Sequence, residues 1–313
     1  MEKRVLVIGE LNIDMIVSGL PVLPALGHEF LASGLHIVLG SSSAICAAGL
    51  ARLGTKVDFL GKVGVDYYGD FVLDQLRLLN VGTRHILRDS VIRTGVTISL
   101  TYPGDRALIT YPGCIPLLSL AEINTSILRS YSHLHVGSYF LQQGLQPDLP
   151  ELFRQARRAG LTISLDSGYD PQERWGGDDL LVALGAVDIF IPNETEACAI
   201  SGVNEPEGAL RELSERVKLA VVKCGPDGAM SLQDGLVLHS PGFKVEVRDT
   251  TGAGDSFNAG FLHAYVIQGL PLEEALRFAN ACGALSTTGF GGTAAQPTLE
   301  QARTFLKVAG TSE

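Results

Sequence analysis

Short apolar runs that alternate with helix-like segments are the feature of this 313-residue sequence that most restricts its fold. The runs are rich in Val, Ile and Leu, as buried strands are, and the segments between them place apolar residues at helical spacing. We expect strands at Val5–Ile8, Val57–Leu60, His133–Val136, Thr162–Leu165, Ile189–Ile191, Ala220–Lys223 and Lys244–Val247. We expect helices at Ser43–Leu53, Phe71–Leu79, Leu149–Ala159, Asp179–Leu184, Glu194–Ser201, Gly252–Gly269 and Leu272–Thr287. This order predicts an α/β fold, a doubly wound and mostly parallel sheet with helices on both faces.

Two stretches, at about residues 12–38 and 94–112, depart from this alternation because they look β-rich without a helix between strands. In the second stretch, Thr94–Thr101 and Ala107–Tyr111 flank Pro103-Gly104-Asp105, a turn sequence typical of a β-hairpin. We predict that both stretches form a small sheet projecting from a single domain that spans residues 1–313. Such a sheet could cover an edge or act as a lid over a site. The lid is favoured, because long excursions from a compact fold are usually functional.

Charge and cysteine content exclude several classes of protein. The formal net charge is −10 and no basic cluster stands out, so a nucleic-acid partner is not expected. The five cysteines are far apart, without a CxxC pair, which indicates neither a zinc site nor a disulfide framework. No apolar run approaches the length of a membrane span. We therefore expect a cytoplasmic protein with reduced thiols and no membrane partner.

The run Asp249-Thr-Thr-Gly-Ala-Gly-Asp-Ser-Phe257 is the strongest local motif. It follows a predicted strand and opens a long helix, so the N–H groups of Gly252, Ala253 and Gly254 would point outward at a helix N-terminus. This geometry binds anions and suits the charge that develops on a phosphoryl group in transfer. Asp255 would lie in the first helical turn, where it could accept a proton from an attacking hydroxyl. The alternative is a helix start in which Asp255 only complements the helix dipole.

Other nucleotide-binding motifs are absent from the sequence. The run is not a Walker A loop, because no GxxxxGK[ST] pattern occurs. The first strand is followed by Gly9-Glu-Leu-Asn12 in place of GxGxxG, which argues against a nicotinamide-dependent oxidoreductase.

The Asp249–Phe257 run resembles the C-terminal signature of the ribokinase family, the phosphofructokinase-B (PfkB) type carbohydrate kinases. Gly40–Gly54 looks like the N-terminal signature of that family, and Gly61-Lys-Val-Gly64 with Asp66 and Gly69 fits its Gly-x-Asp-x-x-Gly element. Pro192-Asn-Glu-Thr-Glu196 matches its Asn-x-x-Glu motif, and Val222–Gly228 its nucleotide-side turn. The matches follow the family order over nearly the whole chain, so the sequence is identified as a member.

The resemblance implies where the acceptor binds. It places Asp14 against two substrate hydroxyls, which a carboxylate accepts well. Gly40, Ser41 and Ile45 stand where relatives touch the sugar, but this chain has Ser41 and Ile45 where Gly and Asn are usual. This departure leaves the identity of the acceptor open. Asp166 resembles an acidic position of fructokinase-like members, although the Asn-x-Arg that follows it there is missing.

The resemblance also implies the nucleotide and metal sites. Asn193 and Glu196 would position Mg²⁺ through water, although Asn-x-x-Glu also fits a capping box. Gly225 and Gly228 would lie under ATP, with Lys223, in place of the usual Thr or Ser, reaching phosphate. Asn280 resembles an adenine-side position, and simple exposure is its alternative reading. A K⁺ site beside the anion loop would be formed by Asp249, Thr251 and Gly291.

Together these observations predict an ATP- and Mg²⁺-dependent kinase with Asp255 as general base and Gly252–Gly254 as its anion hole. The acceptor would be a small sugar or sugar derivative, and the reacting group a hydroxyl, which we expect to be a primary one. A nucleoside such as adenosine is the main alternative, and a non-catalytic sugar-binding regulator is a second. Because relatives often pair through their lid sheets, a homodimer formed through the lid is a further expectation.

Overall fold

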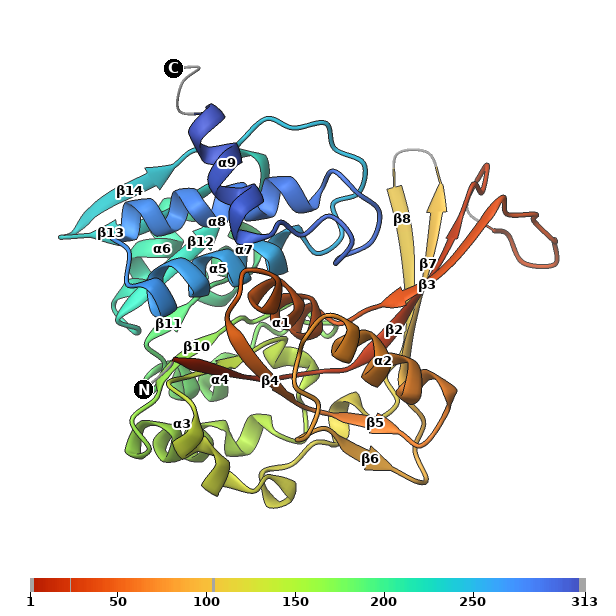
Figure 1. The fold of residues 1–313 in the computed structure, drawn as a ribbon, viewed down its shortest axis with the longest axis horizontal. Helices are drawn as coiled ribbons and strands as arrows, with labels where there is room; N and C mark the ends of the chain where they lie inside the picture. The colour runs from red at the N-terminus through yellow and green to blue at the C-terminus, as the bar shows by residue number, and fades with distance from the viewer. Residues whose placement is uncertain (1–2, 23, 103–104, 310–313) are drawn as a thin grey trace.

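The computed structural model describes residues 3–22, 24–102 and 105–309. Its main sheet has the strand order β14-β13-β12-β11-β10-β9-β1-β4, and all neighbours are parallel except the β12–β13 and β13–β14 pairs. The strands are β1 (Arg4–Ile8), β4 (Lys56–Leu60), β9 (His133–Val136), β10 (Thr162–Leu165), β11 (Ile189–Phe190), β12 (Leu219–Lys223), β13 (Ala229–Gln233) and β14 (Leu236–Ser240). The predicted doubly wound, mostly parallel sheet is confirmed (Figure 1).

Helices cover both faces of the main sheet. Successive residues of a strand point to opposite faces, so each face carries a layer of apolar side chains that a helical layer buries. Leu6 and Ile8 of β1 join one core with α3 (Leu149–Arg158), α4 (Gly177–Leu184), α5 (Glu194–Ser201) and α6 (Pro206–Ser214). Val5 and Val7 join the opposite core with α1 (Ser42–Arg52), α2 (Tyr67–Leu78), α7 (Ala253–Phe261), α8 (Leu272–Ser286) and α9 (Leu299–Ala309). Figure 1 shows the two helical layers, with α3 and α4 below the sheet and α7, α8 and α9 above it.

Minor elements complete the fold. A two-stranded parallel sheet pairs β5 (Lys62–Gly64) with β6 (Leu87–Asp89), and a π-helix, Leu262–Gln268, continues α7. Short 3₁₀ helices lie at Ile115–Leu117, Leu120–Glu122, Thr125–Ser130, Tyr139–Leu141, Gln146–Asp148 and Gly225–Asp227. Among the described residues, no helix is long and apolar enough to cross a membrane.

A separate four-stranded sheet forms the predicted lid. Its order is β3-β2-β7-β8, with β2 at Asn12–Ser18, β3 at Gly34–Leu39, β7 at Gly95–Tyr102 and β8 at Asp105–Tyr111. Figure 1 shows this sheet projecting from the side of the main body. Pro103 and Gly104 of the predicted hairpin turn lie outside the described residues.

Residues paired across the lid strands share a face, so the register defines two faces. Asp14 pairs with Val38 and Ile16 with His36, and in the parallel partner Ile16 pairs with Ser99. We call the face that carries Asp14, Ile16, Ser18, His36, Val38, Thr97, Ser99 and Thr101 the inner face. The opposite, outer face carries Met15, Val17, Leu35, Ile37, Val96, Ile98, Leu100, Ile109 and Tyr111.

The sequence-based prediction of a strand at Lys244–Val247 is wrong. This segment is irregular, although its side chains alternate as they would in a strand. The described sheet ends at β14, and no described strand pairs with residues 244–247. Without a neighbouring strand, alternation alone provides no hydrogen-bonded ladder. Helix α6 was not predicted, and the long helix expected at Gly252–Gly269 is α7 followed by the π-helix.

Candidate functional site

Several polar residues from different strands meet at the carboxyl edge of the main sheet. Glu10 follows β1, Asp166 follows β10, Asn193 follows β11 and Lys223 ends β12. The chain runs from β1 outward to β4 and then returns to β9 on the other side of β1, so β1 lies at a topological switch point. Open α/β sheets bind ligands in the crevice at such a point.

The glycine-rich run forms the N-terminus of α7 at this edge. Gly252 is the N-cap residue with φ 74°, a left-handed conformation that favours glycine. A Cβ atom on Gly252 would lie 2.7 Å from Gly292 Cα and 3.0 Å from Ile45 Cγ2, so no larger residue fits between these neighbours. Position 252 therefore carries no side chain that could cover the amides of the first helical turn, the groups that bind an anion.

Asp255 lies in the first turn of α7, as the motif predicted. Burial raises the pKa of its carboxyl group well above the ordinary value of 3.8, and the negative charge of Asp166 raises it further. Lys223 and a hydrogen bond from Ser42 act in the opposite direction. A carboxylate with a raised pKa is a stronger proton acceptor than an ordinary surface aspartate.

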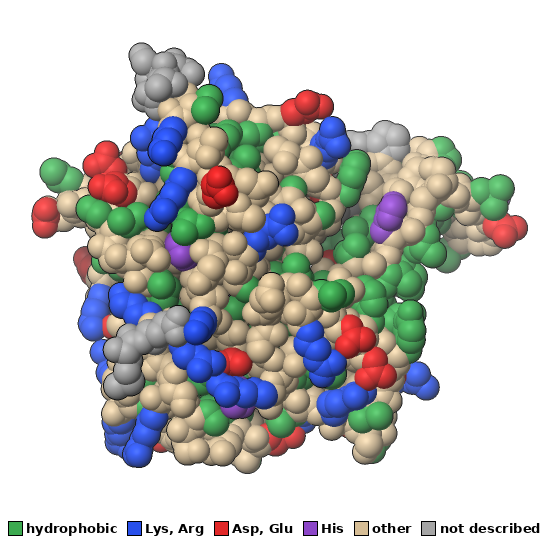
Figure 2. Space-filling view, viewed as in Figure 1, with side chains coloured by type: hydrophobic (Ala, Val, Ile, Leu, Met, Phe, Trp, Pro, Cys, Tyr) green, Lys and Arg blue, Asp and Glu red, His purple; other side chains and the backbone are tan. Residues whose placement is uncertain are grey.

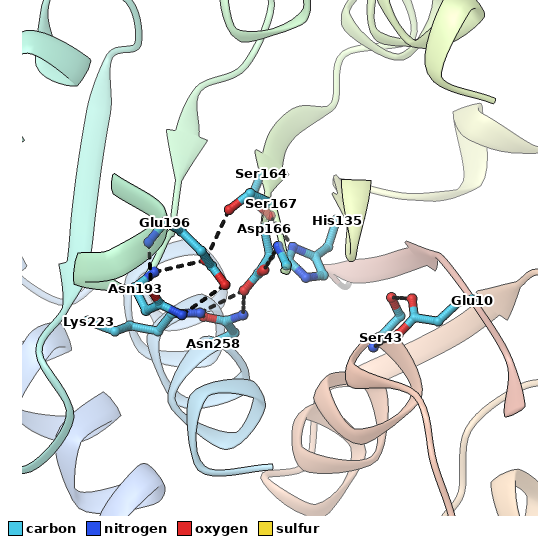
Figure 3. A network of polar contacts seen from close by, with 11 residues as sticks. Glu10, Ser43, His135, Ser164, Asp166, Ser167, Asn193, Glu196, Lys223 and Asn258 are labelled. Atoms are coloured by element: carbon cyan, nitrogen blue, oxygen red, sulfur yellow. Dashed lines mark hydrogen bonds and ion pairs between the residues drawn. The ribbon is translucent and has the colours of Figure 1, made fainter. Parts of the chain in front are cut away.

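Lys223 and Asp166 form a buried ion pair beneath the anion loop (Figure 3). The Lys223 Nζ atom donates to Asp166 Oδ2 at 2.7 Å and to Asn258 Oδ1 at 3.3 Å, and Asn258 Nδ2 donates to the same Asp166 oxygen. A Cβ atom on Gly254 would lie 3.6 Å from Lys223 Nζ. The ammonium group therefore stands directly beside the amides that would receive a phosphate.

The pKa shifts of the pair agree on its charge state. Burial tends to raise the pKa of Asp166, but Lys223 and Asn258 outweigh it, and the pKa is lowered. Burial tends to lower the pKa of Lys223, but Asp166 and Glu196 outweigh it, and the pKa is raised. Both groups are therefore charged at neutral pH. The sequence placed Asp166 in the acceptor site, whereas the structure shows its carboxylate occupied by Lys223 and Asn258.

Asn193 and Glu196 form the capping box that was the alternative reading of their motif. Asn193 Oδ1 accepts from Glu196 N at 2.8 Å, and Glu196 Oε2 accepts from Asn193 N at 3.0 Å. Asn193 Nδ2 also donates to Glu196 Oε1, and Ser167 Oγ donates to Glu196 Oε2. Burial and the charge of Asp166 raise the pKa of Glu196. The carboxylate lies beside the Lys223–Asp166 pair (Figure 3), and its charge helps to raise the pKa of Lys223.

Asp14 is held on the inner face of the lid by a neighbour that the sequence reading did not single out. Asn12 Nδ2 donates to Asp14 Oδ1 at 2.9 Å and to Thr97 Oγ1 at 3.2 Å. A Cβ atom on Gly40 would lie only 2.3 Å from Asp14 Oδ1, so glycine is required there. Asn12 and Asp14 are two residues apart in a β-rich segment, so they share one strand face. This spacing is the sequence signal that could have identified Asn12 as a partner of Asp14.

Ser41 and Ile45, which depart from the family pattern, have structural partners. Ser41 has φ 74° and caps α1: its Oγ accepts from Ala44 N at 2.9 Å and donates to Glu10 O at 2.6 Å. The hydroxyl hydrogen is therefore already used. Ile45 is only 3% exposed and packs under the anion loop, so it supports this loop and offers little surface to an acceptor.

Glu10 is a second residue that the sequence reading did not single out. Its buried carboxylate accepts from Ser43 N at 3.1 Å and from Ser43 Oγ at 2.5 Å. Burial raises its pKa in spite of these bonds. In Figure 3 the Glu10–Ser43 pair lies apart from the Lys223 cluster, at the start of α1. Glu10 therefore connects the end of β1 to the start of α1, the helix that follows Gly40.

The predicted nucleotide-side residues lie around the end of β12. Gly225 has φ 55° with open space at its Cβ position, whereas a Cβ atom on Gly228 would lie 2.1 Å from Ser240 O. Asn280 donates to Ser240 O at 2.9 Å and to Pro241 O at 3.2 Å. Asn280 is buried, so exposure, the alternative explanation for it, is wrong. Its side chain holds the segment after β14 in place.

Asp249, Thr251 and Gly291 come together as predicted. The two oxygens of Asp249 accept from Thr251 N at 2.9 Å and from Gly291 N at 2.8 Å. The carboxylate thus ties the segment before α7 to the loop after α8. Among the described residues, no group of three or more His, Cys, Asp or Glu side chains is arranged to hold a metal ion.

Comparison with known proteins gives the family. Residues 2–299 match the model of the pfkB family carbohydrate kinases. A Halopiger xanaduensis protein named ATP-dependent ribose-1-phosphate kinase is 32% identical over 306 residues, which cover 97% of this chain and 98% of the relative. Fructokinase-2 of Solanum lycopersicum is 31% identical over 324 residues, which cover 96% of this chain and 94% of the relative.

Solved structures agree with this assignment. A ribokinase II candidate from E. coli, in complex with ATP and Mg²⁺, has a TM-score of 0.87 at 27% identity and covers 98% of this chain and 99% of its own. Ribokinase from Thermotoga maritima has a TM-score of 0.84 at 26% identity, covering 97% of this chain and 99% of its own. The chain therefore belongs to the pfkB family of carbohydrate kinases, phosphotransferases with an alcohol group as acceptor.

Proposed function

We propose that this protein transfers the γ-phosphoryl group of ATP to a hydroxyl of a small sugar or sugar-derived acceptor. The observation that carries the proposal is the arrangement at the start of α7. Asp255, the Gly252–Gly254 amides and the Lys223 ammonium group are gathered at the carboxyl edge of the sheet. One group accepts a proton, and the others stabilise negative charge on a phosphoryl group.

In the proposed reaction, Asp14 holds two acceptor hydroxyls on the inner face of the lid. Asp255 removes the proton from the reacting hydroxyl, whose oxygen then attacks the γ-phosphorus in line. The bond to the β-phosphate oxygen breaks and ADP leaves with that oxygen. The amides at Gly252, Ala253 and Gly254 hydrogen-bond to the γ-phosphoryl oxygens during transfer. Lys223 adds a positive charge next to them.

ATP would lie against the turn from Lys223 to Gly228, where Gly225 leaves open space. Asn280 would act indirectly, by holding the segment at Ser240 and Pro241 that borders the nucleotide. Mg²⁺ commonly binds through one or two carboxylates, waters and substrate phosphates. Asn193 and Glu196 fit an indirect role, because Glu196 keeps lone pairs beyond its three hydrogen bonds. When bound, the ion supplies charge neutralisation on the phosphates.

We also propose that K⁺ binds beside the anion loop, between the segment before α7 and the loop after α8. Asp249 connects these two segments through its hydrogen bonds with Thr251 N and Gly291 N. Carbonyl oxygens would contribute most of the ligands, since both carboxylate oxygens already accept hydrogen bonds. The five thiols are free, and four of them are buried. This supports a reducing, cytoplasmic compartment.

A nucleoside is the second candidate acceptor. The ring of Phe290 is 72% exposed and lines a cavity between the lid and the main body, where it could stack on a base. The cavity also contains basic groups, which a neutral base does not require. A nucleoside is therefore the second candidate, and the acceptor assay described next includes nucleosides.

The test is an ADP-release assay with ATP and Mg²⁺ across pentoses, hexoses, their phosphates and acids, and nucleosides. We expect acceptor-dependent ADP release with at least one sugar-derived compound and formation of its phosphate ester. Binding of sugars without ADP release from any acceptor would contradict the proposed kinase activity and support a non-catalytic sugar-binding regulator.

We further propose that two copies of the chain pair through the outer face of the lid. The outer-face residues named above are all apolar, and Leu35, Ile37, Ile109 and Tyr111 among them are substantially exposed. Figure 2 shows hydrophobic side chains on the projecting lid. An apolar sheet face of this kind is unusual on a monomer.

Replacing Ile37 and Ile109 with aspartate is expected to convert a dimer into a monomer, because each buried charge would lack a partner. Sedimentation velocity would measure the change. Val91→Asp is the control, because Val91 is also an exposed hydrophobic residue and lies outside the lid. A wild-type protein that sediments as a monomer at micromolar concentration would contradict the pairing.

A further inference from the structure

A cavity of about 300 Å³ lies between the inner face of the lid and the loops around the anion site. Its lid wall is formed by alternate residues of three strands, including Ile16, Ser18 and His36. Its opposite wall is formed by the Arg248–Thr251 segment and by Phe290 and Gly291. The cavity is therefore bounded by the predicted lid on one side and by the predicted cation loop on the other.

The cavity continues the row of inner-face positions that begins with Asp14. Asp14, Ile16 and Ser18 are alternate residues of β2, so their side chains point to the same face. Positions two apart on a strand are separated by roughly 7 Å. A group that lies at Ile16 and Ser18 is thus a neighbour of the hydroxyls proposed at Asp14, on the side toward the tip of the lid.

Two basic side chains, Arg248 and His36, line this cavity without a partner of their own. Within the described part of the chain, neither side chain makes an ion pair or a hydrogen bond with another residue. The acidic group in the same wall, Asp249, has both oxygens turned to the amides of Thr251 and Gly291. The cavity therefore offers basic donors, while the nearby carboxylate is engaged elsewhere.

Uncharged donors are available on the lid wall as well. Ser18, Ser99 and Thr101 present hydroxyl groups on the inner face and line the cavity. A guanidinium group with several hydroxyls and an imidazole is a donor-rich set that suits a planar or tetrahedral oxyanion. It is poorly matched to an apolar ligand, because the donors would lose their hydration without replacement.

We propose that this cavity binds an anionic substituent of the acceptor, either a phosphate ester or a carboxylate, with Arg248 as the charged donor and His36 as a second donor. The inference rests on the proposed function, because it takes the acceptor hydroxyls to be held at Asp14. The acceptor is then a sugar phosphate or a sugar acid whose charged group lies toward the lid tip and whose reacting hydroxyl lies at Asp255.

The test uses the full-length protein and steady-state ADP release with ribose, ribose 1-phosphate and ribonate as acceptors. We expect a charged acceptor to be preferred over ribose. Arg248→Met should lower kcat/KM for that acceptor by about 10- to 100-fold, the range for a lost hydrogen bond to a charged group, and should leave kcat/KM for ribose within about 2-fold. Arg248→Lys should recover part of the loss. The preference between phosphate and carboxylate identifies the anion.

Arg158→Met is the matched control, since it removes an exposed arginine from α3, outside the cavity. It should leave the acceptor preference unchanged. Equal kcat/KM for ribose and both charged acceptors, or a nucleoside preferred over all three, would overturn the inference and leave the kinase activity intact. If no acceptor releases ADP, the proposed function fails. In that case calorimetry with ribose 1-phosphate tests whether the cavity binds an anion. Equal affinity of the wild type and Arg248→Met for this compound would overturn the inference.

Discussion

Replacing Asp255 with asparagine is expected to lower kcat by about 10²- to 10⁴-fold, the usual contribution of a general base. The amide has nearly the same shape as the carboxylate but cannot accept the proton of the acceptor hydroxyl. The Gly252–Gly254 amides and the turn from Lys223 to Gly228 are untouched. ATP affinity, measured by calorimetry, should therefore stay close to that of the wild type, and the loss should appear in turnover.

The pH profile gives an independent check on the base. The raised pKa of Asp255 means that its carboxyl group becomes the active, deprotonated form only at a pH clearly above 3.8. The acid limb of kcat/KM should therefore lie well above the range of an ordinary aspartate and be absent from any residual activity of Asp255→Asn. A variant with near-normal turnover would remove Asp255 from the role of base.

Replacing Lys223 with methionine should destabilise the protein by about 3–5 kcal/mol, because Asp166 would remain as a buried charge without its partner. Chemical denaturation at neutral pH would measure the change. Asp166 has a lowered pKa in the folded state, so its contribution to stability is present above its ordinary value of 3.8 and is lost as the pH falls through the folded-state pKa. The difference from wild type should shrink over that acidic range.

Two further variants separate the role of Lys223 in stability from its role at the phosphate. Lys223→Met combined with Asp166→Asn should regain part of the stability, since no buried charge is left, yet turnover should stay low if Lys223 acts on the phosphoryl group.

Lys223→Met alone should also shift the acid limb of kcat/KM to higher pH, because Lys223 lowers the pKa of Asp255. Lys218→Met, which breaks an exposed ion pair near the start of β12, is the control and should cost about 1 kcal/mol or less. Normal turnover in the double variant would limit Lys223 to a structural role.

Local patterns predicted most of the fold. The ranges expected for β9, β10 and α5 match the observed ones, because buried strands and amphipathic helices depend on the spacing of apolar residues within one segment. Lys244–Val247 shows the limit of this reasoning: its alternation is that of a strand, but a strand also needs a neighbour, which the local sequence does not specify. The lid was predicted for the same reason as the main sheet, from β-rich segments bounded by turn residues.

In the candidate site, too, some features follow from the local sequence and others from the packing of distant segments. The sequence by itself determined the contiguous parts, namely the anion loop and the placement of Asp255 in the first turn of α7, since these depend on glycine conformation and helix geometry. Only the tertiary structure decided that Lys223 pairs with Asp166, 57 positions away in the chain, and that Asn258 joins them. It also decided that Ser41 caps α1, that Ile45 supports the loop, and that Arg248 and His36 share one cavity. These relations arise from the packing of distant segments, which no local spacing encodes.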